Sequence, residues 1–431
     1  MNDLLEKIRD KSAKIGVIGL GYVGLPLVTE FAEAGFTIIG FDLNRQKINR
    51  LNKGESYIDD VSDDLLSRHT QNGRIVATDD FGRLAEVDAI SICVPTPLSK
   101  TGDPDVSYID SAVNKIVQYG RKGQLIVLES TTYPGTTREQ ILPRLINKGL
   151  TVGRDFFLAF SPERIDPGNP RFQTRNIPKI VGGVEENSGR VARVLYQNIT
   201  RVIPVSNEKV AETAKLLENI FRSVNIALAN EIALVCDKLE IDVWEVIDAA
   251  ATKPFGFMPF YPGPGLGGHC IPVDPSYLSW KMRSHGYEVR FIELARSINK
   301  YMPLHVIYKV AAALNQSRKC LNGSRILVIG VAYKPDVDDY RESPSFDIID
   351  MLTDQGAHIE YHDPHIREIK IKDETLQSVP LSAEQLSQTD CALILTGHKA
   401  VDYELLLKHA PVIMDTRNAM KDFPDPKIIK L

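Results

Sequence analysis

A glycine- and proline-rich stretch at residues 261–274 carries the side chain best suited to covalent chemistry. It reads Tyr-Pro-Gly-Pro-Gly-Leu-Gly-Gly-His-Cys-Ile-Pro-Val-Asp. Proline lacks a backbone donor and glycine lacks conformational restraint, so the stretch is predicted to be a loop that lets backbone approach a ligand. Cys270 lies on this loop, and Asp274 follows shortly after. A thiol presented in this way is a candidate nucleophile, and the alternative is a buried cysteine in a turn.

Two polar residues on a predicted helix, residues 210–236, could assist this thiol. Lys215 and Asn219 are four positions apart, so they lie one turn apart on one face of the helix. Taken alone, Lys215 is more typical of a solvated surface lysine than of a catalytic one. His269 precedes Cys270, but adjacent loop side chains usually diverge. We therefore expect His269 to be structural or ligand-contacting rather than the base for the thiol.

A dinucleotide-binding turn is predicted near the start of the chain. Residues 13–18 form an apolar strand pattern, Gly19-Leu-Gly-Tyr-Val-Gly24 follows, and a helix pattern then leads to a second strand that ends at Asp42. In this context the three glycines permit the tight turn, the approach of the pyrophosphate and close helix–strand packing. The carboxylate of Asp42 suits a ribose hydroxyl and repels a 2′-phosphate, which favours NAD over NADP. Arg45 and Lys47 keep NADP open as an alternative.

Three further strand patterns, at 89–94, 125–128 and 156–160, each lead into a polar or proline-rich loop. Ligands of open α/β sheets bind outside the carboxyl ends of the strands. We therefore expect these loops to converge on the cofactor, with Thr131 and Glu163 facing the reacting centre. Helix capping and turn formation are the alternative roles for each of them taken singly.

The whole chain is predicted to be α/β, with two Rossmann-like parallel-sheet domains joined by a central helical domain. Strand patterns restart at 325–330 and recur at 357–363, 391–396 and 412–415. The stretch after Gly330 lacks the GxGxxG pattern, and its Lys334 and Arg341 look placed for a phosphate-bearing ligand. The predicted boundaries are 1–205 for the dinucleotide-binding domain, 206–315 for the helical domain with the cysteine loop, and 316–431 for the C-terminal α/β domain.

Composition limits the possible partners and compartments. The 431 residues are 43% hydrophobic and 25% charged with a net charge of −5, which gives no general attraction to nucleic acid or to anionic membranes. The five cysteines are widely spaced without a CxxC pair, which indicates a reducing compartment and no metal site. We find no signal-peptide pattern and no apolar run of membrane-spanning length. A cytoplasmic protein is therefore expected.

These motifs together resemble the UDP-glucose/GDP-mannose dehydrogenase family over essentially the whole chain. The resemblance rests on Gly19-x-Gly-x-x-Gly24, Cys93-Val-Pro-Thr-Pro97, Glu129-Ser-Thr131, Ser161-Pro-Glu-Arg164, Lys215 with Asn219, Gly267-Gly-His-Cys-Ile-Pro-Val-Asp274 and Lys334 through Arg341-Glu-Ser343. It implies an NAD domain, a helical dimerising segment and a C-terminal domain that binds the nucleotide of a UDP-sugar. It also implies four-electron oxidation of C6 of the sugar to the acid with two NAD⁺, for surface polysaccharide biosynthesis.

The loops are similar to the branch that acts on UDP-N-acetylhexosamines, with UDP-N-acetylglucosamine 6-dehydrogenases most similar. The UDP-glucose branch carries a lysine where this chain has Val273, and a second acidic residue where it has Pro167. UDP-GlcNAc is therefore favoured as substrate, with UDP-ManNAc, UDP-GalNAc and UDP-glucose as alternatives. The resemblance implies a homodimer or a higher homo-oligomer.

The resemblance also implies residue roles. The Cys270 thiolate captures the aldehyde from the first oxidation, and the second oxidation gives a thioester that water hydrolyses. Lys215 is expected to stabilise the thiolate and the oxyanion with help from Asn219. Asp274 is expected to position Lys215 and a water, and a general-base role for Asp274 is an alternative. Glu163 is a candidate base for hydrolysis, and Thr131 orients water. The predicted catalytic residues are Cys270, Lys215, Asn219, Asp274, Glu163 and Thr131.

The predicted binding residues form two sets, and no metal ligands are among them. The cofactor set is Gly19, Gly21, Tyr22, Val23, Gly24, Asp42, Lys47, Thr96, Thr131 and Arg341. The substrate set is Glu163, Arg164, Lys215, Asn219, Phe260, Tyr261, Gly267, Lys334 and Arg417. Two alternatives outside this scheme stay open: a two-electron β-hydroxyacid dehydrogenase, which needs neither Cys270 nor a second α/β lobe, and a non-catalytic nucleotide-sugar-binding protein.

Overall fold

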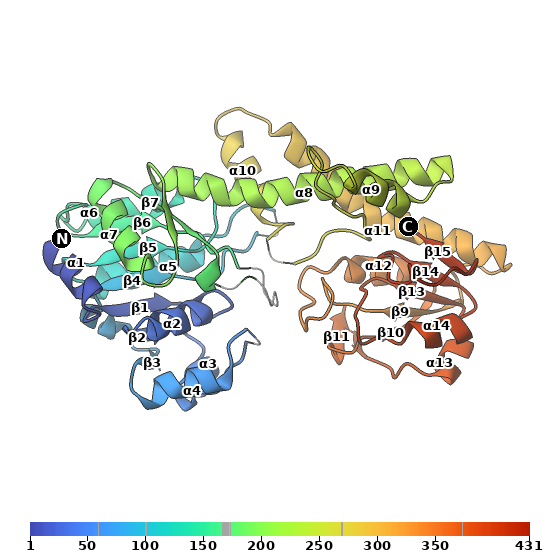
Figure 1. Ribbon diagram of the computed structural model, residues 1–431, viewed down its shortest axis with the longest axis horizontal. Coiled ribbons are helices and arrows are strands. Elements are labelled where there is room, and N and C mark those ends of the chain that lie inside the picture. The colour runs from blue at the N-terminus through green and yellow to red at the C-terminus, as the bar shows by residue number, and fades with distance from the viewer. Residues whose placement is uncertain (59, 100, 166–171, 173, 269, 373) are drawn as a thin grey trace. The chain divides into compact units, whose positions relative to one another are not determined.

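The chain divides into two compact units. The computed structural model (Figure 1) describes residues 1–58, 60–99, 101–165, 172, 174–268, 270–372 and 374–431. The first unit comprises Met1–Glu218 and Ser276–Tyr287, and the second comprises Asn219–Pro275 and Glu288–Leu431. Helix α8, Glu208–Leu239, begins in the first unit and continues into the second. Among the described residues, no helix combines the length and the apolar character needed to cross a membrane.

The first unit is built on an eight-stranded sheet in the order β3-β2-β1-β4-β5-β6-β7-β8. All neighbours pair in parallel except β6 and β7, which are antiparallel. The apolar runs predicted as strands form β1, β2, β4, β5 and β6, whereas β3, β7 and β8 were not predicted. The strands are β1 (Lys14–Ile18), β2 (Thr37–Phe41), β3 (Ile75–Thr78), β4 (Ala89–Ile92), β5 (Leu125–Leu128), β6 (Phe157–Phe160), β7 (Lys179–Gly183) and β8 (Val202–Pro204).

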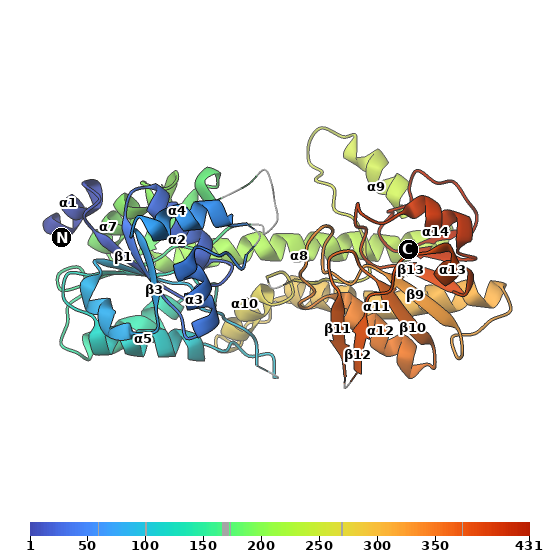
Figure 2. The ribbon, with the colours of Figure 1, turned by 90° about the horizontal axis from the view of Figure 1, so that it is seen from below.

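Helices cover both faces of this sheet, as Figure 2 shows for α5 and α7 on opposite sides. One apolar core joins the sheet to residues of α1, α2 and α7, and another joins it to α5 and α6. Because both faces are covered, the central strands are apolar throughout. The helices are α1 (Asn2–Arg9), α2 (Gly24–Glu33), α3 (Arg45–Lys53), α4 (Asp63–Gln71), α5 (Ser107–Tyr119), α6 (Leu142–Ile146) and α7 (Glu186–Tyr196).

The second unit contains a five-stranded parallel sheet in the order β10-β9-β13-β14-β15 and a separate antiparallel hairpin of β11 and β12. Two parallel α/β sheets in one chain confirm the predicted fold class. The strands are β9 (Arg325–Ile329), β10 (His358–His362), β11 (Glu368–Ile371), β12 (Glu374–Gln377), β13 (Cys391–Ile394), β14 (Ile413–Asp415) and β15 (Ile428–Lys430). The helices are α9 (Val243–Ala251), α11 (Arg290–Gln316), α12 (Pro344–Asp354), α13 (Ala383–Ser387) and α14 (Tyr403–His409).

The described residues 261–268 and 270–273 of the glycine- and proline-rich stretch are in neither helix nor strand, and Asp274 is the first residue of α10 (Asp274–Arg283). Pro303 lies inside α11.

Candidate active site

The turn between β1 and α2 has the steric requirements of a dinucleotide site. A side chain at Gly24 would collide with the carbonyl oxygen of Gly19, and one at Gly19 would collide with that of Cys93. At Gly21, in contrast, no atom of the described chain lies within 4 Å of the place a Cβ would occupy. Two glycines are therefore required by the protein itself, whereas Gly21 leaves space that a pyrophosphate can use. The turn fits NAD.

Asp42 lies at the end of β2, where the pattern predicted a ribose ligand. Its Oδ2 accepts a hydrogen bond from the Leu20 N–H at 2.9 Å, and its Oδ1 accepts one from the Asn44 N–H at 2.8 Å. These bonds tie the carboxylate to the glycine turn and fix its direction. Nearby, the Lys47 ammonium lies 5.7 Å from the ring centroid of Tyr57, whose hydroxyl donates to the Leu20 carbonyl at 2.7 Å. Tyr22 is exposed, and Val23 caps α2.

The loops after β4 and β5 are joined, as predicted for residues that share one sheet edge. The Thr96 hydroxyl donates to the Thr131 carbonyl at 2.7 Å, and the Tyr277 hydroxyl of α10 donates to the Thr96 carbonyl. Tyr277 is fully buried. The sequence analysis missed Tyr277, because only the fold brings α10 to these loops.

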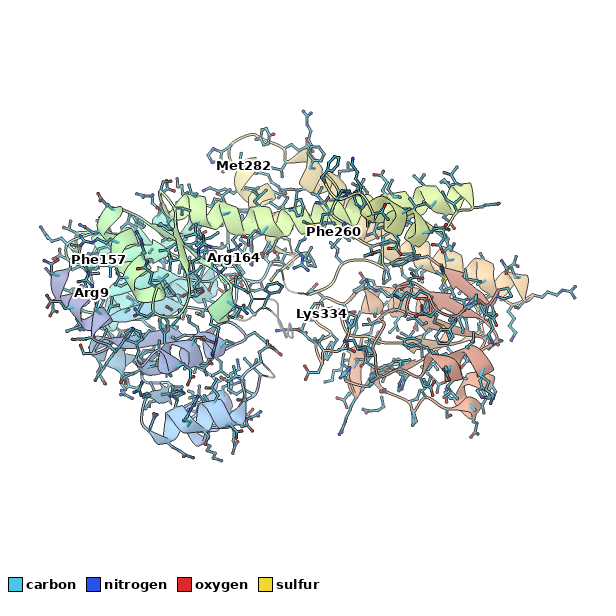
Figure 3. The ribbon with its side chains drawn as sticks, viewed as in Figure 1. Arg9, Phe157, Arg164, Phe260, Met282 and Lys334 are labelled. Carbon is cyan, nitrogen blue, oxygen red and sulfur yellow. The ribbon has the colours of Figure 1, made fainter. Side chains whose placement is uncertain are left out.

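Glu163 and Arg164 follow β6, and each is held by a specific partner. The Glu163 Oε1 accepts the N–H groups of Arg164 and Ile165 at 2.7 and 2.9 Å, and its Oε2 lies 3.3 Å from the Lys179 ammonium. Arg164, labelled in Figure 3, pairs with Glu218 of α8 at 2.6 Å. Lys179 was not among the predicted residues. Pro167 lies outside the described residues, so the departure noted there has no structural account.

Lys215 is also in the first unit, and its side chain is 8% exposed. This burial is inconsistent with a solvated surface lysine. An ammonium is costly to remove from water unless an anion or a hydrogen-bonding group compensates it. A role in keeping the helix soluble therefore does not explain the burial of Lys215.

In the second unit, Asn219 and Asp274 meet. The Asn219 side-chain amide donates to the Asp274 Oδ2 at 2.5 Å, and both residues are buried. Asp274 is at the N-terminus of α10, and its N–H donates to the Cys270 carbonyl at 2.8 Å. Cys270 itself is exposed. The loop therefore presents its thiol on the surface of this unit, directly before a buried Asn–Asp pair. His269 lies outside the described residues.

A second asparagine of α8 holds the other end of this loop. The Asn230 Oδ1 accepts the Gly263 N–H at 2.9 Å, and the Asn230 amide donates to the Asn299 Oδ1 of α11 at 2.9 Å. The Asn299 amide in turn donates to the Ser223 carbonyl at 3.2 Å. Both asparagines are buried. Neither asparagine was among the predicted site residues.

The middle of the loop packs against the segment that follows β9. A Cβ at Gly267 would lie 2.9 Å from the Glu342 carbonyl oxygen, and one at Gly268 would lie 2.9 Å from the Tyr333 ring. The Gly268 N–H donates to the Arg341 carbonyl at 3.2 Å. These glycines are therefore required by the protein's own packing, in addition to any ligand.

Three predicted ligand contacts of the second unit are charged: Lys334 and Arg417 for the substrate, and Arg341 for the cofactor. The Arg417 guanidinium adjoins Gly263 and donates to the Leu395 carbonyl at 2.9 Å, and burial lowers its pKa to about 10, so it stays charged. The Lys334 ammonium, labelled in Figure 3, lies 5.7 Å from the Tyr333 ring centroid. The Arg341 guanidinium pairs with Asp339 at 2.6 Å.

The two aromatic residues that open the loop are anchored on helices. Phe260 meets Phe221 of α8 edge to face, with ring centroids 5.8 Å apart. Tyr261 stacks on Trp244 of α9 at 5.6 Å, and its hydroxyl donates to Asp248 at 2.8 Å.

One group with the composition of a metal site lies in the second unit: Asp336, His365 and His398. The His398 Nδ1 accepts the Asp336 N–H at 3.0 Å, which places the ring proton on Nε2, where it donates to Asp363 at 3.1 Å. Both nitrogens of His398 are thus occupied by the protein. This arrangement suits the buried hydrogen-bond network around Asp363 rather than a cation.

The doubly wound sheet, the glycine turn and the Asp42 carboxylate define an NAD-dependent oxidoreductase. Sequence comparison adds the rest of the chain: the UDP-glucose/GDP-mannose dehydrogenase family matches with its NAD binding domain at residues 13–200, its central domain at 209–301 and its UDP binding domain at 327–422. The chain belongs to this family and is an NAD-dependent nucleotide-sugar dehydrogenase. A two-electron β-hydroxyacid dehydrogenase does not account for the UDP binding domain.

Individual relatives carry more than one substrate in their names. UDP-N-acetyl-D-mannosamine dehydrogenase of Methanococcus maripaludis is 35% identical over 392 residues, 90% of this chain and 86% of that protein. UDP-N-acetyl-D-glucosamine 6-dehydrogenase of Pseudomonas aeruginosa is 35% identical over 359 residues, 83% of this chain and 84% of that protein. The solved structure of a UDP-D-ManNAc dehydrogenase from Pyrococcus horikoshii has a TM-score of 0.89 at 32% identity, covering 97% and 98% of the two chains.

Proposed function

We propose that this protein oxidises C6 of a UDP-N-acetylhexosamine, with UDP-GlcNAc favoured, from the alcohol to the acid in two NAD-dependent steps. The observation that carries the proposal is the exposed Cys270 on a loop fixed at both ends by buried asparagines of α8. Val273 in place of the lysine of the UDP-glucose branch supports an N-acetylated sugar. Relatives named for UDP-GlcNAc and for UDP-ManNAc are equally similar, so UDP-ManNAc is the first alternative, followed by UDP-GalNAc and UDP-glucose.

NAD⁺, when bound at the glycine turn, supplies the hydride acceptor for both oxidations. Between them, the Cys270 thiolate adds to the aldehyde carbon and gives a thiohemiacetal, whose oxidation leaves a thioester on the sulfur. Water then attacks the thioester carbonyl and gives one proton to a base. The C–S bond breaks to release the thiolate, and the acid product loses a second proton to solvent as it becomes the carboxylate. Covalent capture retains the reactive aldehyde and divides a four-electron oxidation into separate steps.

Residues of both units have roles in this scheme. Lys215 stabilises the thiolate and the oxyanion at C6, and Asn219 donates a hydrogen bond to the same oxygen or to a water. Asp274 orients Lys215 and that water. Asp274 can hold Asn219 for this task because the two side chains are already hydrogen-bonded. Glu163 accepts the proton of the hydrolytic water, and Thr131 orients water near the nicotinamide.

The nucleotide of the substrate is proposed to bind in the second unit. Lys334 and Arg417 supply positive charge for the diphosphate, and the loop backbone at Gly267 approaches the sugar. Phe260 and Tyr261 line the entry of the same loop. Arg164 is proposed to contact the sugar from its own unit, and Arg341 to contact the cofactor. We also propose that the domain boundaries lie between residues 205 and 206 and between residues 315 and 316.

The proposed oligomer is a homodimer formed through α8 and α11. Two rows of exposed apolar side chains repeat at seven-residue spacing: Phe221, Leu228 and Val235 on α8, and Leu294, Tyr301 and Tyr308 on α11. This spacing keeps each row on one helix face, which is typical of helix–helix association. Both helices also supply anchors of the cysteine loop. Light scattering should give the mass of a dimer, and Leu228→Arg should reduce it to that of a monomer.

We also propose a cytoplasmic location and a role in surface polysaccharide biosynthesis. No disulfide joins the five cysteines, all of which lie among the described residues, as is usual in a reducing compartment. A sugar acid on a nucleotide carrier is a substrate for glycosyl transfer.

The test is NADH formation with UDP-GlcNAc, UDP-ManNAc, UDP-GalNAc, UDP-glucose and GDP-mannose. We expect two NADH per sugar, the highest kcat/KM with UDP-GlcNAc, and no net acid formation by Cys270→Ser, which should still bind NAD and UDP-sugar. Cys320→Ser, at another exposed cysteine, is the matched control and should be fully active. Normal acid formation by Cys270→Ser would refute the covalent scheme, and one NADH per sugar would refute the four-electron reaction.

A further inference from the structure

Three charged side chains of the first unit form a buried row behind the cofactor edge of the sheet. The Lys179 ammonium, from the first residue of β7, lies 2.6 Å from the Glu129 Oε2 and 3.3 Å from the Glu163 Oε2. It also donates to the Pro162 carbonyl at 3.3 Å. The side chains of Lys179, Glu129 and Glu163 are 3%, 0% and 11% exposed. Glu163 is thus the member of the row with access to the surface.

Fold stability does not account for this row. Removing an ion from water costs several kcal/mol even after relaxation, and apolar side chains of the same volume are often equally stable in such places. Burial alone would lower the pKa of Lys179, but the Glu129 and Glu163 carboxylates raise it above its ordinary value, so the side chain is an ammonium. The row therefore places a full positive charge against Glu163.

The far end of the row is fixed. The Tyr196 hydroxyl, from α7, donates to the Glu129 Oε1 and lies 3.1 Å from the Ser91 hydroxyl of β4. Glu129 thus has Tyr196 on one oxygen and Lys179 on the other. Burial raises the pKa of Glu129, and the Lys179 ammonium opposes this rise. A carboxylate held in this way cannot turn to meet a ligand, so its function is to hold Lys179.

The charged and titratable groups around Glu163 leave its orientation fully determined. Its Oε1 accepts two backbone N–H groups, and its Oε2 meets Lys179. The neighbouring Arg164 guanidinium is directed to Glu218 instead, and burial raises the pKa of the nearby Cys93 thiol, which stays neutral. Among the described residues, no charged side chain outside the row forms a salt bridge or a hydrogen bond with Lys179, Glu129 or Glu163.

We infer that Lys179, held by Glu129, is a positioning residue that holds the Glu163 carboxylate in the direction it needs as the base in thioester hydrolysis. The inference rests on the proposed function of Glu163. Lys179 takes no proton from water and touches no substrate in this scheme. Its effect is on the last step alone, because the oxidation steps use Cys270 and Lys215.

The test compares Glu129→Gln/Lys179→Met with wild type. The double variant loses one positive and one negative charge, so the buried net charge is unchanged and the variant should fold, whereas Lys179→Met alone would leave two buried carboxylates without a cation. Lys179→Arg is the conservative variant. Lys122→Met is the matched control, since Lys122 pairs with Asp155 on the surface.

We expect the double variant to bind NAD with wild-type affinity and to release NADH in a rapid burst, with an acyl-enzyme that accumulates and is visible by mass spectrometry. Acid release should slow by about 10- to 100-fold, less than the roughly 100- to 10,000-fold expected for loss of the base itself, because Glu163 is still present. Lys179→Arg should restore the wild-type rate of acid release in large part, and Lys122→Met should not differ from wild type.

Several results would overturn the inference, and they differ from failure of the proposed function. Acid release by the double variant at the wild-type rate, with no accumulated acyl-enzyme, would refute the role of Lys179. Unchanged hydrolysis by Glu163→Gln would refute it as well, because there would be no base to position. If wild type forms no NADH with any UDP-sugar, the proposed function fails, and the inference fails with it.

Discussion

The anchor of the cysteine loop at Gly263 can be tested through Asn230 and Asn299. Asn230→Leu keeps the size of the side chain but removes the acceptor of the Gly263 N–H and the donor to Asn299. A buried N–H without a partner costs about 1–3 kcal/mol, and a lost hydrogen bond about 0.5–1.5 kcal/mol. The free energy of unfolding should therefore fall by about 2–4 kcal/mol. Acid formation should fall with it, because the loop carries Cys270, while NAD affinity should not change.

The double variant Asn230→Leu/Asn299→Leu separates this network from general damage. Each single variant leaves the other amide buried and without its asparagine partner, and the double variant removes both amides. Its loss of stability should be smaller than the sum of the two single losses by about 0.5–3 kcal/mol, as for residues in one hydrogen-bond network. Urea unfolding followed by tryptophan fluorescence measures these differences.

Asn225→Leu is the matched control on the same helix. Its amide bonds only to the Phe221 carbonyl of α8 and is not in the network, so its effect should stay within about 0.5 kcal/mol. Additive losses in the double variant, or a loss for Asn225→Leu equal to that for Asn230→Leu, would refute the argument.

Three further predictions concern the cofactor turn and the C-terminal sheet. Gly21→Ala should leave the thermal midpoint near that of wild type and weaken NAD binding at least about tenfold. Gly24→Ala should lower both the thermal midpoint and the NAD affinity, because only a side chain at Gly24 collides with the chain. Equal thermal midpoints for the two variants would contradict this. Asp42→Ala should weaken NAD binding and relax discrimination against NADP, and unchanged NAD affinity would show that the ribose assignment is wrong. Hydrogen bonds, that from His398 foremost, outweigh burial and lower the pKa of Asp363 to about 2, so its ionisation contributes about 2 kcal/mol of stability above pH 4 that is lost as pH falls from about 4 to 2. The stability difference between wild type and Asp363→Asn should shrink over that window, and a constant difference would contradict it.

Local patterns were sufficient to predict the fold class and the cofactor turn. Apolar runs such as 125–128 correspond to central strands because both of their faces are covered by helices. The glycine turn is informative because strand, loop, helix and Asp42 follow in a fixed order. Strands β7 and β8 gave no comparable signal: Lys179 begins β7, and β7 pairs antiparallel with β6, which the alternating strand–helix pattern does not predict.

Long-range partners explain what the sequence left open in the site. Lys179 is 50 residues from Glu129, and Asn299 is 69 residues from Asn230, so no local spacing connects them. Judged from its sequence neighbours alone, each of these polar residues could be an ordinary surface side chain. Only its burial together with a specific partner distinguishes it from one. One signal was present in the sequence: the helix pattern at residues 210–236 has polar residues at positions where a buried helix would usually be apolar. Asn230 is one of these positions, whereas Lys179 lies outside this helix.

The glycines of the two loops have different physical causes, although both loops looked alike as sequence. At Gly21 the space that a side chain would take is open, so the requirement for glycine comes from a ligand. At Gly267 the same space is bounded by the Glu342 carbonyl and by Tyr333, so the requirement comes from the chain. A substitution at Gly21 therefore acts on binding, whereas one at Gly267 moves the backbone that precedes Cys270. The cysteine loop is thus a part of the folded core of its unit that carries a reactive residue at its surface.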